Sequence, residues 1–421
     1  MFEIRVPYGR GKYLTHAIDE SFIFEEIKPA QVEAADNPEN EIIRAIDNPI
    51  GDSGLGQFKD AKSVAIVISD PTRPVPSKLI LKVLLDKLEQ LGVGTERISV
   101  LVGSGLHPPC SEEEAREIIG EDVFSKVKVV VHDANNESTL TYLGESSGKT
   151  PIWINNAYLN AEKRIVTGMI DPHQFMGFSG GGKGLVIGLG GARTIEANHS
   201  LMKEEGAELG CIINNPARTD LDEIGARVGI DFVVNVVLNH KKMLHQCIAG
   251  DFMAVHRAGV NIAERIVKVK VSQPADVVIA SPGGYPKDIN VYQAQKGLAS
   301  AERIVKPGGV IILAAECSQG MGDDLFNDAI VKYHTPEEIV ASFAEEKFKM
   351  GAHKAFFWAR SLTKAKVIMV SDKLSPEIGK KLMVTIVPDL ATAWEKAEKL
   401  TEIKRVCVMP LASSTVPVTQ D

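Results

Sequence analysis

Short runs of β-branched residues alternate with helical segments along most of this chain. Ser63–Ser69 (SVAIVIS) and Ile98–Gly103 (ISVLVG) are two such runs, and a segment with helical periodicity follows each of them. Continuous apolar strands separated by helices are typical of parallel sheets that are covered on both faces. The alternation therefore predicts an α/β fold with mostly parallel sheets flanked by helices.

The alternation is interrupted once, near residues 265–275. The sequence there, VKVKVSQPAD, is polar and contains Pro274, and the alternation restarts with the strand pattern Asp276–Ala280. A chain of 421 residues is long enough for two or three domains. We predict an N-terminal α/β domain over residues 1–268, which binds the cofactor and carries the catalytic groups, and a C-terminal α/β domain over residues 269–421.

Composition excludes several classes of partner. The formal net charge is -8 at pH 7, which argues against nucleic acid and anionic membrane surfaces as partners. No apolar run reaches the roughly 18 residues that a membrane span needs, and the N-terminus lacks a secretory signal pattern. The five cysteines are scattered and form no CxxC motif. We expect a cytoplasmic protein with reduced thiols and no membrane association.

The richest stretch for chemistry is residues 171–199, DPHQFMGFSGGGKGLVIGLGGARTIEANH. Within it, Gly177–Gly184 contains five glycines and Lys183. Glycine lets the backbone approach a ligand closely, and a lysine held there is a candidate for covalent attachment or phosphate contact. His173 and His199 flank the loop and are candidates for a base and a metal ligand.

Three classes of protein could carry a pattern of this kind. A phosphate-binding P-loop would need Ser or Thr after the lysine, where this chain has Gly184. It would also follow a strand directly, whereas here other residues separate the predicted strand Arg164–Met169 from Gly177. A nicotinamide dehydrogenase would carry GxGxxG in its first strand–helix turn, but Ser69–Pro76 has no glycine. A non-catalytic metal- or cofactor-binding protein would need no histidine base in addition to a metal ligand. The alternatives kept open are a P-loop-like phosphate-transfer enzyme and the non-catalytic binding protein.

The chemically capable residues follow the ends of predicted strands. The carboxyl ends of strands in an open α/β sheet form the edge where ligands bind. The groups are Asp70, Thr72 and Arg73 after Ser63–Ser69; His107 after Ile98–Gly103; His173 and the glycine loop after Arg164–Met169; and Tyr292, Gln293 and Lys296 beyond Asp276–Ala280. We expect them to converge on one active site in a cleft between the two domains.

Together these motifs resemble the nickel-pincer lactate racemases and their 2-hydroxyacid racemase and epimerase homologues. The resemblance covers most of the chain, in order. Its pieces are Asp70-Pro-Thr-Arg73-Pro, Gly103–His107-Pro, Asp171-Pro-His173 with the loop to Lys183, Ala197-Asn-His199, and Tyr292-Gln293-Ala-Gln-Lys296, with Trp358 near the place of a family tryptophan. Gly182 before the lysine and Pro108-Pro109 after His107 depart from the lactate-specific pattern. These departures concern the substrate more than the chemistry.

The resemblance implies a specific cofactor. Lys183 would carry, as a thioamide, a pyridinium-3-thioamide-5-thiocarboxylic acid mononucleotide that holds Ni(II) through S, C and S, and His199 would be the fourth ligand. The loop would give the adduct room and offer backbone N–H groups to its phosphate. The residues implied in cofactor binding are Asp70, Thr72, Ser179, Gly180, Gly181, Gly182 and Lys183. Separate cofactor-synthesis and nickel-insertion proteins would be partners, so the chain alone would be inactive.

The resemblance also implies the reaction. A 2-hydroxyacid would be inverted at C2 by hydride transfer to and from the cofactor, through a 2-keto acid. His107 and His173 would be the bases, one for each orientation of the hydroxyl group. Arg73 and Lys296 would hold the carboxylate and carbonyl oxygens, Tyr292 and Gln293 would add hydrogen bonds, and Trp358 would line the pocket or belong to the core. The motifs leave open whether the substrate is lactate, a larger 2-hydroxyacid or a sugar acid.

Overall fold

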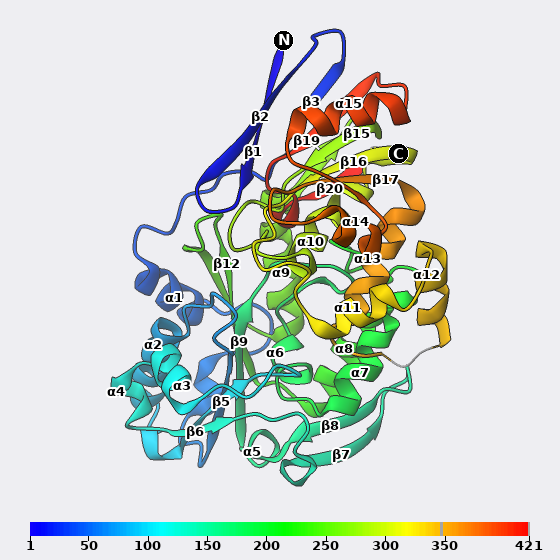
Figure 1. Cartoon of the computed structure of the whole chain (residues 1–421). Coiled ribbons are helices and arrows are strands. Elements are labelled where there is room, and N and C mark those ends of the chain that lie inside the picture. Colours follow the sequence, from blue (N-terminus) through cyan, green and yellow to red (C-terminus); the bar gives the residue numbers. More distant parts are fainter. Residues whose placement is uncertain (346–347, 420–421) are drawn as a thin grey trace. The chain divides into compact units, whose positions relative to one another are not determined.

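The computed structural model describes residues 1–345 and 348–419. Its internal contacts divide the chain into a central unit, Gln31–Ile266, and a terminal unit made of Met1–Ala30 and Val267–Asp421. The first thirty residues therefore belong with the C-terminal part of the chain, whereas the predicted division placed them in the N-terminal domain. The reason is a strand pairing: β3 (Ile23–Glu26) lies parallel to β19 (Arg405–Met409), blue beside red in Figure 1. Nothing local in the sequence signals so distant a partner.

The central unit is built on a six-stranded sheet in the order β13-β12-β9-β4-β5-β6. Its strands are β4 (Val64–Ser69), β5 (Ile98–Gly103), β6 (Lys128–Val131), β9 (Lys163–Met169), β12 (Phe232–Leu238) and β13 (Leu244–Gly250). The pairings are parallel except at the β12–β13 edge. Strands such as β4 are apolar and buried up to their last residue because helices cover both faces, which confirms the prediction of mostly parallel sheets flanked by helices.

Helices and small hairpins complete the central unit. Local signals start the helices: Ser111 and Glu114 form a capping box at α3, and the Asn215 side chain caps α8, whose first residue is Pro216. The helices are α1 (Pro38–Asp47), α2 (Ser77–Gln90), α3 (Glu112–Ile119), α4 (Glu121–Phe124), α5 (Asn156–Leu159), α6 (Lys183–Val186), α7 (Ala192–Ser200), α8 (Pro216–Val228) and α9 (Phe252–Val267). The hairpins are β7 (Leu140–Glu145) with β8 (Pro151–Asn155), and β10 (Pro172–His173) with β11 (Gly177–Phe178).

The terminal unit has its own six-stranded parallel sheet, in the order β18-β17-β16-β15-β19-β3. Its further strands are β15 (Ala275–Ala280), β16 (Val305–Ala314), β17 (Lys366–Val370) and β18 (Thr385–Val387), with the hairpin β1 (Phe2–Tyr8) and β2 (Lys12–Ile18) and the pair β14 (Lys268–Val271) and β20 (Val416–Thr419). Its helices are α10 (Val291–Glu302), α11 (Asp324–Val331), α12 (Pro336–Glu345), α13 (His353–Lys364), α14 (Pro376–Leu382) and α15 (Leu390–Leu400). Within the described part of the chain, none of the helices is long and apolar enough to cross a membrane.

The strand orders decide which loops meet. In the central unit β9, β4 and β5 are neighbours and run in parallel. The loops that follow them, with His173, Asp70 and His107 respectively, therefore leave the sheet at one edge, as predicted for this part of the chain.

Candidate active site

The glycine-rich loop is held on its inner side by polar groups from β12 and α8. The backbone N–H of Gly181 donates to Asn235 Oδ1 at 2.7 Å. The buried Arg218 guanidinium donates to the Gly180 carbonyl at 3.2 Å and pairs with Asp222 at 2.9 Å. The Ser179 hydroxyl donates to the Met169 carbonyl at 2.8 Å. These contacts fix the path of the loop before any ligand is present.

Two glycines of this loop are needed because neighbouring protein atoms pack closely against the backbone there. Gly180 and Gly181 have φ values of +86° and +60°, which disfavour other residues. A Cβ atom on Gly180 would lie 2.5 Å from Ile170 Cγ1, and one on Gly181 would lie 2.8 Å from Arg218 Nη2. The expectation that these glycines leave room for a bulky adduct is therefore wrong on this side of the loop, because protein atoms already fill the space.

A Gly180→Ala substitution is expected to destabilise the protein by about 2 kcal/mol or more, since it adds backbone strain and a steric clash. Gly182→Ala is the matched control: its φ is -68°, and the nearest atom to a new Cβ is 3.6 Å away. Chemical denaturation of both variants measures the difference. Equal stabilities would show that the loop relaxes freely.

Lys183 is the first residue of α6 and is only partly accessible. Burial, with the nearby positive charges of Arg73 and Arg218, lowers the pKa of Lys183 to about 7. No carboxylate of the described residues forms an ion pair with it. At neutral pH a large fraction of its amine is therefore uncharged, and an uncharged amine is the nucleophilic form.

His199 lies in the last turn of α7, with 5% of its surface exposed. Burial, aided by the charge of Lys183, lowers the pKa of His199 to about 3. Its imidazole is thus neutral across the physiological range, which is the form that binds metals.

His107 is oriented by a carboxylate. Its Nδ1 lies 2.6 Å from Asp70 Oδ2, and Asp70 Oδ1 accepts from the Thr72 hydroxyl at 2.6 Å. Burial opposes ionisation of Asp70, but the hydrogen bonds from His107 and Thr72 outweigh it and hold the pKa of this carboxyl below its usual range. Because the ionised carboxylate only accepts, Nδ1 of His107 carries the proton and Nε2 keeps a lone pair.

His173 has the opposite arrangement. The backbone N–H of Met176 donates to its Nδ1 at 3.3 Å, so the proton of the neutral ring is on Nε2. Its ring meets Phe175 edge to face at a centroid distance of 4.7 Å, and Phe175 meets His199 in the same manner at 5.1 Å. The structure thus joins two of the predicted site histidines through one aromatic residue.

The remaining predicted residue of the central unit, Arg73, is exposed and forms no ion pair with any carboxylate in the described part of the chain. Its backbone N–H donates to the Asp70 carbonyl at 3.1 Å, which closes the turn after β4. The side chain therefore keeps its guanidinium donors available to an anion.

The predicted substrate-binding residues of the terminal unit lie on α10. Lys296 Nζ donates to Gln293 Oε1 at 2.9 Å, one turn apart. Tyr292 packs edge to face against Phe326, and burial raises the pKa of its phenol to about 12, so it remains a hydrogen-bond donor. Trp358 is fully buried, and its indole N–H donates to the Leu382 carbonyl at 2.9 Å, which favours the core interpretation of this residue.

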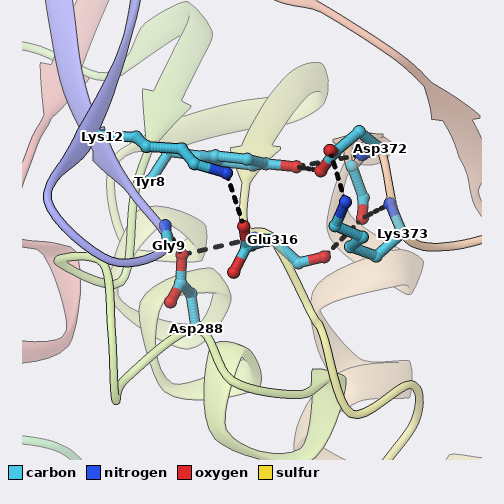
Figure 2. A network of polar contacts seen from close by, with 8 residues as sticks. Tyr8, Gly9, Lys12, Asp288, Glu316, Asp372 and Lys373 are labelled. Atoms are coloured by element: carbon cyan, nitrogen blue, oxygen red, sulfur yellow. Dashed lines mark hydrogen bonds and ion pairs between the residues drawn. The ribbon is translucent and has the colours of Figure 1, made fainter.

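A polar network anchors the segment that leads to α10 (Figure 2). The buried Asp288 carboxylate accepts hydrogen bonds from the backbone N–H groups of Gly9 at 2.6 Å and Glu316 at 3.3 Å. Glu316 pairs with Lys12 at 3.2 Å, and the Tyr8 hydroxyl donates to Asp372. The turn of the N-terminal hairpin and the loops after β15, β16 and β17 are thereby joined at the carboxyl edge of this sheet.

Sequence reasoning missed the residues that support the site. Arg218 and Asn235 contact the glycine loop from outside the motifs that were singled out, and Phe175, which contacts two of the histidines, lies within residues 171–199 but was given no role. The spacing of Arg218 and Asp222, four residues apart on a helix, was a visible signal for an ion pair. Its burial behind the glycine loop was not visible.

The central unit has the arrangement of an enzyme, since burial lowers the pKa values of Lys183 and His199 and a carboxylate orients His107. Comparison with known proteins gives the family. The family model for the lactate racemase N-terminal domain matches residues 8–210, and that for the C-terminal domain matches residues 270–416. The chain belongs to the lactate racemase family and is an isomerase of the racemase class.

Individual relatives agree. The chain is 32% identical over 407 residues to a lactate racemase of Thermoanaerobacterium thermosaccharolyticum, covering 95% of each protein. It is 31% identical to a lactate racemase of Lactiplantibacillus plantarum over 404 residues, 94% of this chain and 95% of the relative. The lactate racemase apoprotein structure from T. thermosaccharolyticum matches with a TM-score of 0.92 and 31% identity over all of both chains. A Thermotoga maritima protein, at 16% identity and a TM-score of 0.62 over 91% of this chain and 97% of its own, shares the fold.

Proposed function

We propose that this chain racemises lactate, with a nickel-pincer nucleotide attached to Lys183 and with His199 as the protein ligand of the nickel ion. Both curated relatives bear the name lactate racemase. The observation that carries the proposal is a lysine without an ion-pair partner among the described residues, at the end of a rigid glycine loop, close enough to His199 for its charge to affect that buried imidazole.

The residues suit such a cofactor. An uncharged amine is what a thioamide linkage requires, and a neutral imidazole is a good ligand for Ni(II). The backbone N–H groups of Gly180 and Gly182 have no partner among the described residues and are available to a phosphate, whereas that of Gly181 is taken by Asn235. In the described chain no three His, Cys, Asp or Glu side chains cluster as a metal site. The remaining nickel donors would therefore come from the nucleotide.

When bound, the nucleotide supplies a ring that accepts and returns hydride. The chain supplies the proton transfers. The Nε2 lone pair of His107, oriented by Asp70, would take the proton from the hydroxyl group of one enantiomer. We assign His173 to the other orientation of the hydroxyl group: in its protonated form it would give a proton to the product oxygen and be left neutral. In the reverse direction the two histidines exchange roles.

The other groups bind and orient. We assign Arg73 and Lys296 to the carboxylate and carbonyl oxygens of the substrate, and Tyr292 and Gln293 to hydrogen bonds with it. Ser179 shapes the cofactor loop through its bond to Met169. We further propose that cofactor-synthesis and nickel-insertion proteins act on this chain in the cytosol, where its five free cysteines stay reduced.

The test is turnover by protein that has been co-produced with cofactor-making proteins. Enantiopure L-lactate and D-lactate should each become the racemate, and elemental analysis should find nickel. If nickel-loaded protein leaves lactate unchanged but inverts a larger 2-hydroxyacid or a sugar acid, the substrate assignment is wrong. If it binds no nickel and inverts none of these acids, the whole proposal fails.

An Asp70→Asn variant should lower the racemisation rate by about 10²- to 10⁴-fold. An amide can donate to Nδ1 of His107, which would move the ring proton to Nε2 and remove the lone pair that acts as base. Glu114→Gln is the control, because it neutralises another carboxylate of the same unit, in the capping box of α3, and leaves the carboxylate–imidazole pair. Rates and adduct mass for both variants decide the matter, and an Asp70→Asn rate within twofold of wild type would contradict the assigned role.

A further inference from the structure

The ring of Phe175 lies between two histidines to which the proposed function gives different tasks. The Phe175 and His173 rings are 4.7 Å apart at an interplanar angle of 78°, and those of Phe175 and His199 are 5.1 Å apart at 75°. Edge-to-face contacts at this separation are the preferred geometry of aromatic pairs. One benzene ring therefore restrains the planes of both imidazoles.

Phe175 is itself firmly placed. It is 3% exposed, and its carbonyl accepts a hydrogen bond of 2.7 Å from Asn215 Nδ2. Asn215 is fully buried, donates also to the Cys211 carbonyl at 2.9 Å, and caps α8 by accepting from the Arg218 N–H. Asn215 thus ties the position of Phe175 to α8, the helix that also supports the glycine loop.

An imidazole can serve a metal only if its donor nitrogen points at the ion, and it can serve as acid or base only if its nitrogen points at the substrate. Neighbours that fix ring orientation are worth about 10- to 100-fold in metal affinity or activity. His199 and His173 rotate about their side-chain bonds unless something packs against their rings. Among the described residues, Phe175 packs against both rings.

We propose that Phe175 is a positioning residue that fixes the ring orientations of His199 and His173, so that nickel ligation and proton transfer occur at the same site. This inference rests on the proposed function. A leucine at this position would fill most of the volume but would lack the flat ring edge and face that set the two planes.

The test compares Phe175→Leu, Phe175→Tyr and Phe178→Leu with wild type, all co-produced with the cofactor-making proteins. Phe178 is equally buried, lies three residues away, and makes no ring contact with either histidine among the described residues. Phe175→Leu should keep the adduct mass, lose nickel to a chelator about 10-fold faster and racemise about 10-fold more slowly in kcat, with little change in KM. Phe175→Tyr, which keeps the ring, should recover most of both properties.

Several results would overturn the inference. One is a folded Phe175→Leu protein that keeps nickel and kcat at wild-type levels. Another is an equal loss of nickel and kcat in Phe178→Leu, which would mean general loosening of the segment. If Phe175→Leu melts far below Phe178→Leu, Phe175→Met carries the same comparison. Failure of the proposed function looks different, because wild type itself would then lack nickel and racemisation.

Discussion

Lys183→Ala protein, co-produced with the cofactor-making proteins, will have the mass of the bare chain and no racemase activity. The reason is that the only proposed attachment atom, the amine at the end of the glycine loop, is gone, while burial had given that amine a pKa of about 7. Intact-mass spectrometry and a lactate racemisation assay measure the two losses. We expect activity to fall below detection.

Two variants sharpen this result. Lys183→Arg keeps a long basic side chain, but a guanidinium stays protonated and is a poor nucleophile, so this variant should also lack the adduct. Lys296→Ala removes a lysine that we assign to the substrate, so it should keep the full adduct mass and lose substrate affinity. An adduct found on Lys183→Ala protein would refute the assignment of this lysine.

His199→Ala should lose nickel, whereas His107→Ala and His173→Ala should keep nickel and the adduct but racemise about 10²- to 10⁴-fold more slowly. The basis is the different state of each ring: His199 is buried with a pKa of about 3, His107 donates to Asp70, and His173 accepts from the Met176 backbone. The measurement is nickel content beside rate for the three proteins.

The outcome separates the roles clearly. If His107→Ala strips the metal while His199→Ala keeps metal and full activity, the roles are reversed. If all three variants keep nickel, the protein ligand lies elsewhere. Because Phe175 contacts both His173 and His199, His173→Ala should keep its nickel but release it to a chelator slightly faster than His107→Ala, since His107 has no ring contact with Phe175 among the described residues.

Much of the fold could be read from local pattern. The parallel strands β4, β5, β9 and β15 were predicted because their apolar runs are continuous, as burial on both faces requires, whereas the antiparallel edge strand β13 was not predicted. The hairpin of β1 and β2, and the pairing of β3 with β19, were not predicted either. Exposed strands such as β2 contain few buried apolar residues, so their strand pattern is weak. A pairing between the two ends of the chain has no local signature in the sequence.

The sequence alone determined the kinds of chemistry available: a lysine in a glycine loop, histidines after strand ends and a family pattern that runs through most of the chain. Only the tertiary structure decided the chemical state of those groups. Burial of Lys183 and His199, the carboxylate on His107 and the contact of the Phe175 ring with His199 arise from residues distant in sequence that packing brings together. A side chain's pKa and orientation depend on its neighbours in space, and a motif specifies only its neighbours along the chain.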